Sequence, residues 1–75
     1  MADQVLDAKG LNCPLPLLRA RKVLEELPSG STLEVSATDP GTVRNFEDFC
    51  QTSGHELVES RTEGDVFTFV IKRCA

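Results

Sequence analysis

The sequence has no tryptophan and no tyrosine, and its aromatic residues are four phenylalanines among 75 residues. No apolar run approaches the roughly 18 residues that cross a membrane, and the N-terminal residues 1–4 are not typical of a signal peptide. Basic residues are also few, because 8 Lys and Arg stand against 12 Asp and Glu, for a net charge of -4. This acidic balance argues against direct binding to nucleic acid or to an anionic membrane, and we expect a cytoplasmic protein.

The chain has too few cysteines and histidines for a disulfide framework or a zinc site. The chain has Cys13, Cys50 and Cys74 and a single histidine, His55. An odd number of separated cysteines predicts reduced thiols rather than disulfides, and no Cys-x-x-Cys pair is present for thiol redox chemistry. None of the four residues has the spacing of a zinc ligand pair. We therefore expect no metal and no cofactor.

The segment Cys13-Pro14-Leu15-Pro16 is the strongest local signal in the sequence. Pro14 disfavours a helical backbone at Cys13 and itself suits a first helical turn, whereas Pro16 resists helix at Leu15. The helix therefore begins either at Pro14 or at Pro16, and the sequence leaves both open. In both cases Cys13 lies at a helix start. There, free N–H groups such as those of Leu15 and Leu17, and the helix dipole, favour a nucleophilic thiolate.

The run after this motif has the periodicity of an amphipathic helix. Leu15 and Leu18 project away from its apolar face, at the end where Cys13 lies. They are either ordinary exposed leucines or an apolar docking rim beside the thiol, and the pattern favours neither reading. The residues of this apolar face, which we expect to pack on the core, are Leu17, Ala20, Leu24 and Leu27, with Val23 beside them.

The charges on this helix run against the helix dipole. Arg19, Arg21 and Lys22 precede Glu25 and Glu26, although acidic residues are favoured at a helix start. The basic residues either form i, i+4 pairs on a solvated face or present a positive surface to an acidic partner. Because Lys or Arg before Glu is the weaker pair orientation, we favour the second reading. The predicted partner-binding residues are Leu15, Leu18, Arg19, Arg21 and Lys22.

The remaining elements follow from alternation and turn signals. We expect strands at residues 5–8, 32–38, 56–62 and 65–73, with a second helix opened by Asp39-Pro40 and ended by Gly54. Cys50 lies on the apolar face of that helix and is predicted to be buried and inert, whereas Cys74 should be exposed. The order βαβαββ predicts a single domain over residues 1–75, an α+β two-layer sandwich. Its four-stranded mixed sheet should carry both helices on one face.

Six short segments, in this order and spacing, resemble the TusA/SirA-like sulfur-carrier family over nearly the whole chain, and the TusA branch most closely. The chain departs from the family at Asn45, where members carry Asp, and at Leu15, where some carry an acidic residue. The matching segments are Leu6-Asp7-Ala8 with Gly10-Leu11, Cys13-Pro14-Leu15-Pro16, Arg21-Lys22, Asp39-Pro40, Phe49-Cys50 and His55-Glu56-Leu57.

The resemblance implies a role for the cysteine. Cys13 would carry sulfane sulfur as a persulfide, with Pro14 and Pro16 orienting it. The sulfur would come from a desulfurase-type or rhodanese-type donor protein and pass to a cysteine of an acceptor protein, in transfer-RNA thiolation, cofactor biosynthesis or dissimilatory sulfur oxidation. Such a protein is a sulfur carrier more than an enzyme that turns over a small substrate. The alternative is a non-catalytic regulatory module that binds partners through the surface around the motif.

Overall fold

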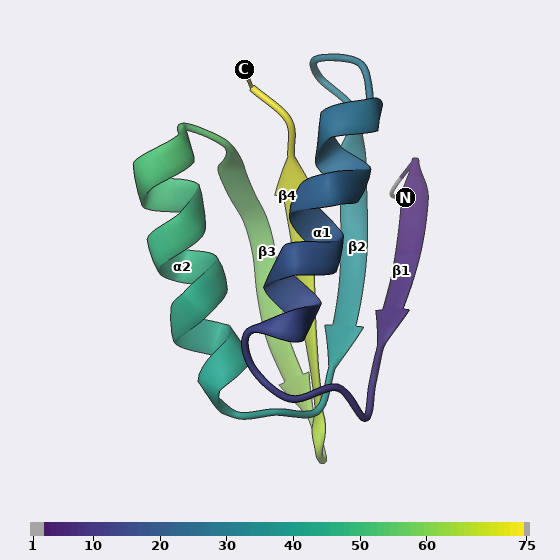
Figure 1. The fold of residues 1–75 in the computed structure, drawn as a ribbon, viewed down its shortest axis with the longest axis vertical. Coiled ribbons are helices and arrows are strands. Elements are labelled where there is room, and N and C mark those ends of the chain that lie inside the picture. Colours follow the sequence, from purple (N-terminus) through teal and green to yellow (C-terminus); the bar gives the residue numbers. More distant parts are fainter. Residues whose placement is uncertain (1–2, 75) are drawn as a thin grey trace.

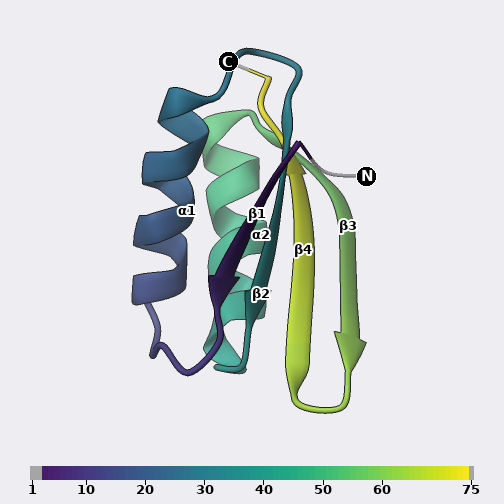
Figure 2. The same ribbon diagram turned by 90° about the vertical axis from the view of Figure 1, so that its right-hand side faces the viewer.

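The computed structural model describes residues 3–74, in which six elements follow one another in the predicted order. Figure 2 shows both helices on one face of the sheet, so the predicted two-layer βαβαββ sandwich is confirmed. The last turn lies at Gly64-Asp65, one residue later than expected. The elements are β1 (Gln4–Ala8), α1 (Leu15–Glu26), β2 (Thr32–Ala37), α2 (Gly41–Ser53), β3 (Glu56–Glu63) and β4 (Val66–Lys72).

The sheet has the strand order β1-β2-β4-β3, which places the C-terminal strand between β2 and β3 (Figure 1). β1 pairs with β2 in parallel, whereas β2–β4 and β3–β4 are antiparallel, so the sheet is mixed as predicted. Across the middle of the sheet, Leu6 is opposite Val35, and Val35 is opposite Phe69. β2 and β4, the two central strands, therefore supply most of the sheet's share of the core.

The core lies between these strands and the two helices. Phe46 of α2 and Phe69 of β4 are both fully buried, and their rings stack with centroids 4.7 Å apart. The apolar face predicted for α1 is confirmed, because Ala20 and Leu24 are buried and the other residues of that face pack partly against the core. The alternation predicted for β2 is also confirmed, since its inward residues Leu33, Val35 and Ala37 are fully buried.

An arginine from the far end of the chain closes the last turn of α1. Leu27 ends this helix with an extended backbone, as expected for a residue before a proline. The Arg73 guanidinium donates to the carbonyl oxygens of Leu24 at 2.8 Å and Glu25 at 2.9 Å, and also to that of Leu27. The Leu27 N–H also donates to the Leu24 carbonyl, at 3.2 Å, but the last carbonyls of a helix lack the regular i+4 donors of its interior. Arg73 supplies further donors there and so joins the end of β4 to the end of α1.

The other face of the sheet carries no helix (Figure 2). Val66 and Val70 alternate along β4 with the core-packed Phe67 and Phe69, so they lie on this face, and both are half-buried. On β3, Arg61 forms ion pairs with Glu59 and, at 3.1 Å, with Glu63. This face therefore combines charged side chains on β3 with valines of the neighbouring strand β4. Within residues 3–74, neither helix is long and apolar enough to cross a membrane.

Candidate functional site around Cys13

Cys13 lies on the loop between β1 and α1, and one carboxylate joins this loop to the start of α2. The Cys13 backbone N–H donates to Asp39 Oδ2 at 2.7 Å, and the Gly41 N–H donates to Asp39 Oδ1 at 2.9 Å. The Gly10 N–H donates to Thr38 Oγ1 at 3.0 Å, which ties the same loop to the end of β2. The cysteine itself is exposed. Its backbone is thus anchored while its thiol stays accessible.

The sulfur of Cys13 rests against the first turns of α2. Asn45 Nδ2 donates a hydrogen bond to Cys13 Sγ. One turn earlier in the helix is Gly41, where an added Cβ would lie 3.7 Å from Cys13 Cβ and 3.8 Å from Cys13 Sγ. The sequence predicted only the start of α1 as the neighbour of the thiol. The structure adds the start of α2, with Asn45 as the polar group at the sulfur.

The Asp39 carboxylate should make the stability of the protein sensitive to acid. Its two backbone donors, first the Cys13 N–H and then the Gly41 N–H, lower the Asp39 pKa from its ordinary value of 3.8. A carboxyl group whose pKa is lower in the folded state stabilises the fold above its unfolded pKa, and that contribution is lost as the pH falls through the folded pKa. We expect the melting temperature to fall below about pH 4, and Asp39→Asn to show a shallower fall. Thermal unfolding from neutral pH downwards measures both, and parallel profiles would contradict this role of Asp39.

The start of α1 lies between the two predicted alternatives. The helix begins at Leu15, with Pro14 as its N-cap residue and Pro16 in its first turn. Pro16 is fully buried, and the Cys13–Pro14 peptide bond is cis. The prediction of a free Leu15 N–H beside the sulfur was wrong, because this group donates to the carbonyl oxygen of Asn12 at 2.8 Å. The Leu15 N–H therefore closes a tight turn before the helix and is not the donor to the thiol that the sequence predicted.

Four of the five predicted partner-binding residues lie along one side of α1. Leu15 and Leu18 are 46% and 50% exposed, and Arg19 and Lys22 are also exposed. Their i, i+3, i+4, i+7 spacing gives a continuous line that starts beside Cys13, which we call the α1 stripe. Arg21 does not join it. Its guanidinium carbon lies 6.0 Å from the centre of the Phe49 ring, on the side that faces α2.

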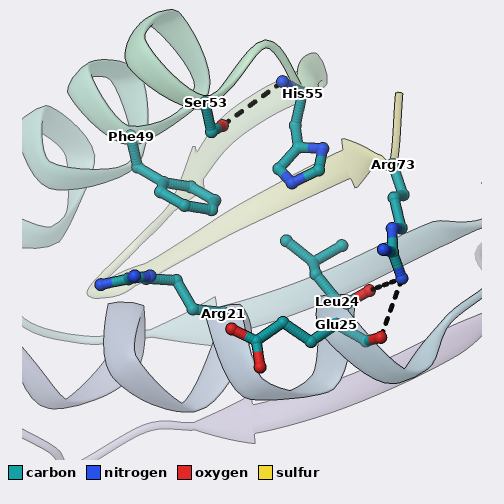
Figure 3. A pocket seen from close by; sticks show the side chains of 7 residues that line it. All are labelled: Arg21, Leu24, Glu25, Phe49, Ser53, His55 and Arg73. Atoms are coloured by element: carbon teal, nitrogen blue, oxygen red, sulfur yellow. Dashed lines mark hydrogen bonds between the residues drawn. The ribbon is translucent and has the colours of Figure 1, made fainter. Parts of the chain in front are cut away.

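Arg21 instead lines a groove between α1 and α2 with a volume of about 250 Å³ (Figure 3). The His55 Nδ1 accepts the Cys74 N–H at 3.2 Å, and the His55 ring lies 5.6 Å from that of Phe49. His55 therefore connects the start of β3 to the C-terminal segment. The groove is lined by Arg21, Leu24, Glu25, Phe49, Ser53, His55 and Arg73.

The other two cysteines occupy different environments. Cys50 is 7% exposed on the apolar face of α2, as predicted. Burial, and to a smaller extent the neighbouring Cys74 thiol, raises the pKa of Cys50 to about 11. A thiol with such a pKa is rarely ionised near neutral pH, so Cys50 is a poor nucleophile. Cys74 is exposed. Among residues 3–74, no group of three or more His, Cys, Asp or Glu side chains converges to hold a metal ion.

The fold and the site define a small α+β sandwich protein built around one exposed, anchored cysteine at a helix start. Comparison with known proteins narrows this class. A model of the family described as "Sulfurtransferase TusA" matches residues 4–73. The chain belongs to the TusA family, which confirms the resemblance carried by the cysteine-proline motif.

Relatives match the chain over almost its full length. It is 56% identical over 71 residues to the sulfur carrier protein TusA of Allochromatium vinosum, covering 95% of this chain and 93% of that protein. It is 42% identical over 73 residues to the sulfur carrier protein TusA of Pseudomonas aeruginosa, covering 97% and 92%. A SirA-like protein from Desulfitobacterium hafniense has the same fold, with a TM-score of 0.84 at 26% identity over 96% of this chain and 99% of that one.

Proposed function

We propose that this protein is a sulfur carrier that accepts a sulfane sulfur on Cys13 as a persulfide and delivers it to a cysteine of an acceptor protein. The observation that supports this most is the contrast between its cysteines. Cys13 has an exposed thiol, an anchored backbone and an amide donor at its sulfur, whereas Cys50 is buried. Family membership supports the same role. Three free thiols suit a reducing compartment, so we also propose that the protein works in the cytoplasm.

The proposed chemistry is two exchanges of one sulfur atom. In loading, the Cys13 thiolate attacks the outer sulfur of a donor persulfide, the donor's S–S bond breaks, and its electron pair leaves on the donor's thiolate. In delivery, a thiolate of the acceptor attacks the outer sulfur on Cys13, and Cys13 leaves as a thiolate. Atoms and charge balance in both steps without an added oxidant or reductant. A cysteine desulfurase or rhodanese-type protein is a suitable donor.

The neighbourhood of Cys13 suits a carrier better than an enzyme with a small substrate. Within residues 3–74 the one histidine, His55, lies in the groove lined by the second half of α1, away from the helix start that carries Cys13. The polar groups that contact Cys13 are the Asp39 carboxylate and the Asn45 amide. Both Asp39 oxygens accept backbone N–H groups and the Asn45 amide acts as a donor, so neither group is arranged as a general base for a small substrate. Selectivity for the transfer must then come from a partner protein.

The test is direct loading. The purified protein is incubated with inorganic polysulfide or a persulfidated rhodanese, and its intact mass is measured before and after reduction. We expect a gain of one sulfur atom on Cys13 that a thiol reductant removes. Absence of this gain, or a gain found on Cys74 alone, would contradict the proposal. Trapping a mixed disulfide in the native host then identifies the acceptor, and so separates transfer-RNA thiolation from sulfur oxidation.

The α1 stripe should control delivery to the partner rather than loading by a small molecule. Arg19→Glu reverses a charge on the α1 stripe and should slow delivery to an acidic acceptor about tenfold through its effect on association. Loading from polysulfide should not change. Lys72→Glu is the matched control, because it makes the same charge change at an exposed position of β4. Equal delivery rates for the two variants would show that the stripe does not bind the acceptor.

The exposed leucines of the stripe favour one alternative, a regulatory module that binds partners without carrying sulfur. That reading predicts that Cys13→Ser complements a deletion strain fully, whereas Arg19→Glu does not. A sulfur carrier predicts that Cys13→Ser fails to complement. The two functions are therefore separated by one strain comparison.

A further inference from the structure

We infer that Asn45 holds the Cys13 sulfur in its anionic form and thereby sets how fast the carrier reacts. This inference rests on the proposed function only where sulfur loading is concerned, because the reactivity of the unloaded thiol can be measured separately. It assigns a role in the transfer to a side chain that lies 32 residues from the cysteine.

The position of the amide is determined from both sides of the contact. On the α2 side, the helix is fixed by the buried neighbours Thr42 and Phe46, and Asn45 itself is half-buried. On the loop side, the Cys13 N–H is held by Asp39 at 2.7 Å. The hydrogen bond from Asn45 Nδ2 to Cys13 Sγ thus joins two anchored segments. Such an arrangement presents the donor to the sulfur before any partner binds.

Helix formation alone does not explain an asparagine here. Asn45 is the fifth residue of α2, beyond the positions where its side chain would cap the helix start. Asparagine is also a poorer helix former in an interior position than long straight-chain residues such as Arg44, Glu47 and Gln51 of this helix. Local departures from helix preference are expected where a side chain serves a site.

The chemistry of the contact favours a negatively charged sulfur. A hydrogen bond to an ionised acceptor is stronger than one to a neutral acceptor, so the amide stabilises the thiolate more than the thiol. An ionised carboxylate, the group that the family pattern has at this position, has no proton to donate and would place a negative charge near the sulfur. The inferred effect of the amide is therefore a property of this chain, whose thiol should react faster than it would beside an aspartate. The amide also has a second N–H. After loading, this N–H is the group that can donate to the outer sulfur of the persulfide.

The experiment measures the alkylation rate of Cys13 by iodoacetamide at neutral pH. A Cys74→Ser background leaves Cys13 as the exposed thiol, since Cys50 is buried. We expect Asn45→Asp, which keeps the shape of the side chain, to slow alkylation about tenfold, and Asn45→Ala to slow it about threefold. Gln51→Glu is the matched control, because it adds the same charge at an exposed position further along α2, and it should react like the parent.

The melting temperature of each variant is also measured. A value near that of the parent excludes unfolding as the cause of a changed alkylation rate. An alkylation rate for Asn45→Asp equal to that of the parent would overturn the inference. The same variants are then loaded with polysulfide, and Asn45→Asp should gain its sulfur more slowly. If the parent protein shows the alkylation dependence but never gains a sulfur, the proposed function fails while the role of Asn45 at the thiol stands.

Discussion

Replacement of Cys13 by serine should abolish sulfur loading. After incubation with inorganic polysulfide, Cys13→Ser should show no persulfide mass, because a serine hydroxyl stays protonated and cannot hold a transferable sulfur. Serine is close to cysteine in size, and the residue is exposed, so the melting temperature should stay near that of the parent. The variant should therefore lose all sulfur loading while its melting temperature changes little.

Cys74→Ser is the matched control for this result, since Cys74 is the other exposed cysteine. It should load like the parent, with the added sulfur located on Cys13 by peptide mass analysis. Cys50 should not substitute for Cys13, because its pKa of about 11 keeps it protonated under the assay conditions. Persulfide on Cys13→Ser at the parent level would mean that sulfur transfer does not use the cysteine-proline motif.

Truncation of Phe46 should have the largest effect on stability. The ring is fully buried and stacks on Phe69 at 4.7 Å, so Phe46→Ala removes the main contact between α2 and the centre of the sheet. Such truncations cost about 3–5 kcal/mol. Small domains have a free energy of unfolding near the lower end of about 5–15 kcal/mol, so the variant should be largely unfolded at 37 °C. Urea denaturation followed by circular dichroism measures the difference.

Phe49→Ala provides the comparison on the same helix. Phe49 is only half-buried and lies at the groove, beside Arg21 and His55. Its removal leaves the contact between α2 and the sheet in place, so we expect a loss of about 1–2 kcal/mol. Equal losses in the two variants would show that the Phe46–Phe69 stack is not the main support of α2.

Much of this fold follows from local patterns in the sequence. Alternation in β2 predicts its buried face, and helical spacing predicts the burial of Ala20 and Leu24. Capping by Arg73 was not predicted. Arg73 is 49 positions from Leu24 and 48 positions from Glu25 in the chain. No local rule relates the end of a strand to the end of a helix so far away in the sequence.

The site was predicted only in part, for the same reason. The Cys13-Pro14-Leu15-Pro16 segment indicates an exposed nucleophile from neighbouring residues alone. Asp39 reads from sequence as the start of a helix, and nothing local indicates that one of its oxygens reaches back 26 residues to the Cys13 N–H. Asn45 stood out only as a departure from the family pattern. Its contact with the sulfur depends on how α2 packs against the loop, which local sequence does not contain.

The anchored loop at Cys13 has a consequence for the order of events in sulfur transfer. Because Asp39 and Thr38 hold the loop to the start of α2 and the end of β2, Cys13 is not carried on a swinging arm. Donor and acceptor must both approach the same side of the molecule to reach its sulfur, so they compete for one surface. Transfer should then be a strict alternation, in which the donor dissociates before the acceptor binds, and excess unloaded acceptor should inhibit loading competitively.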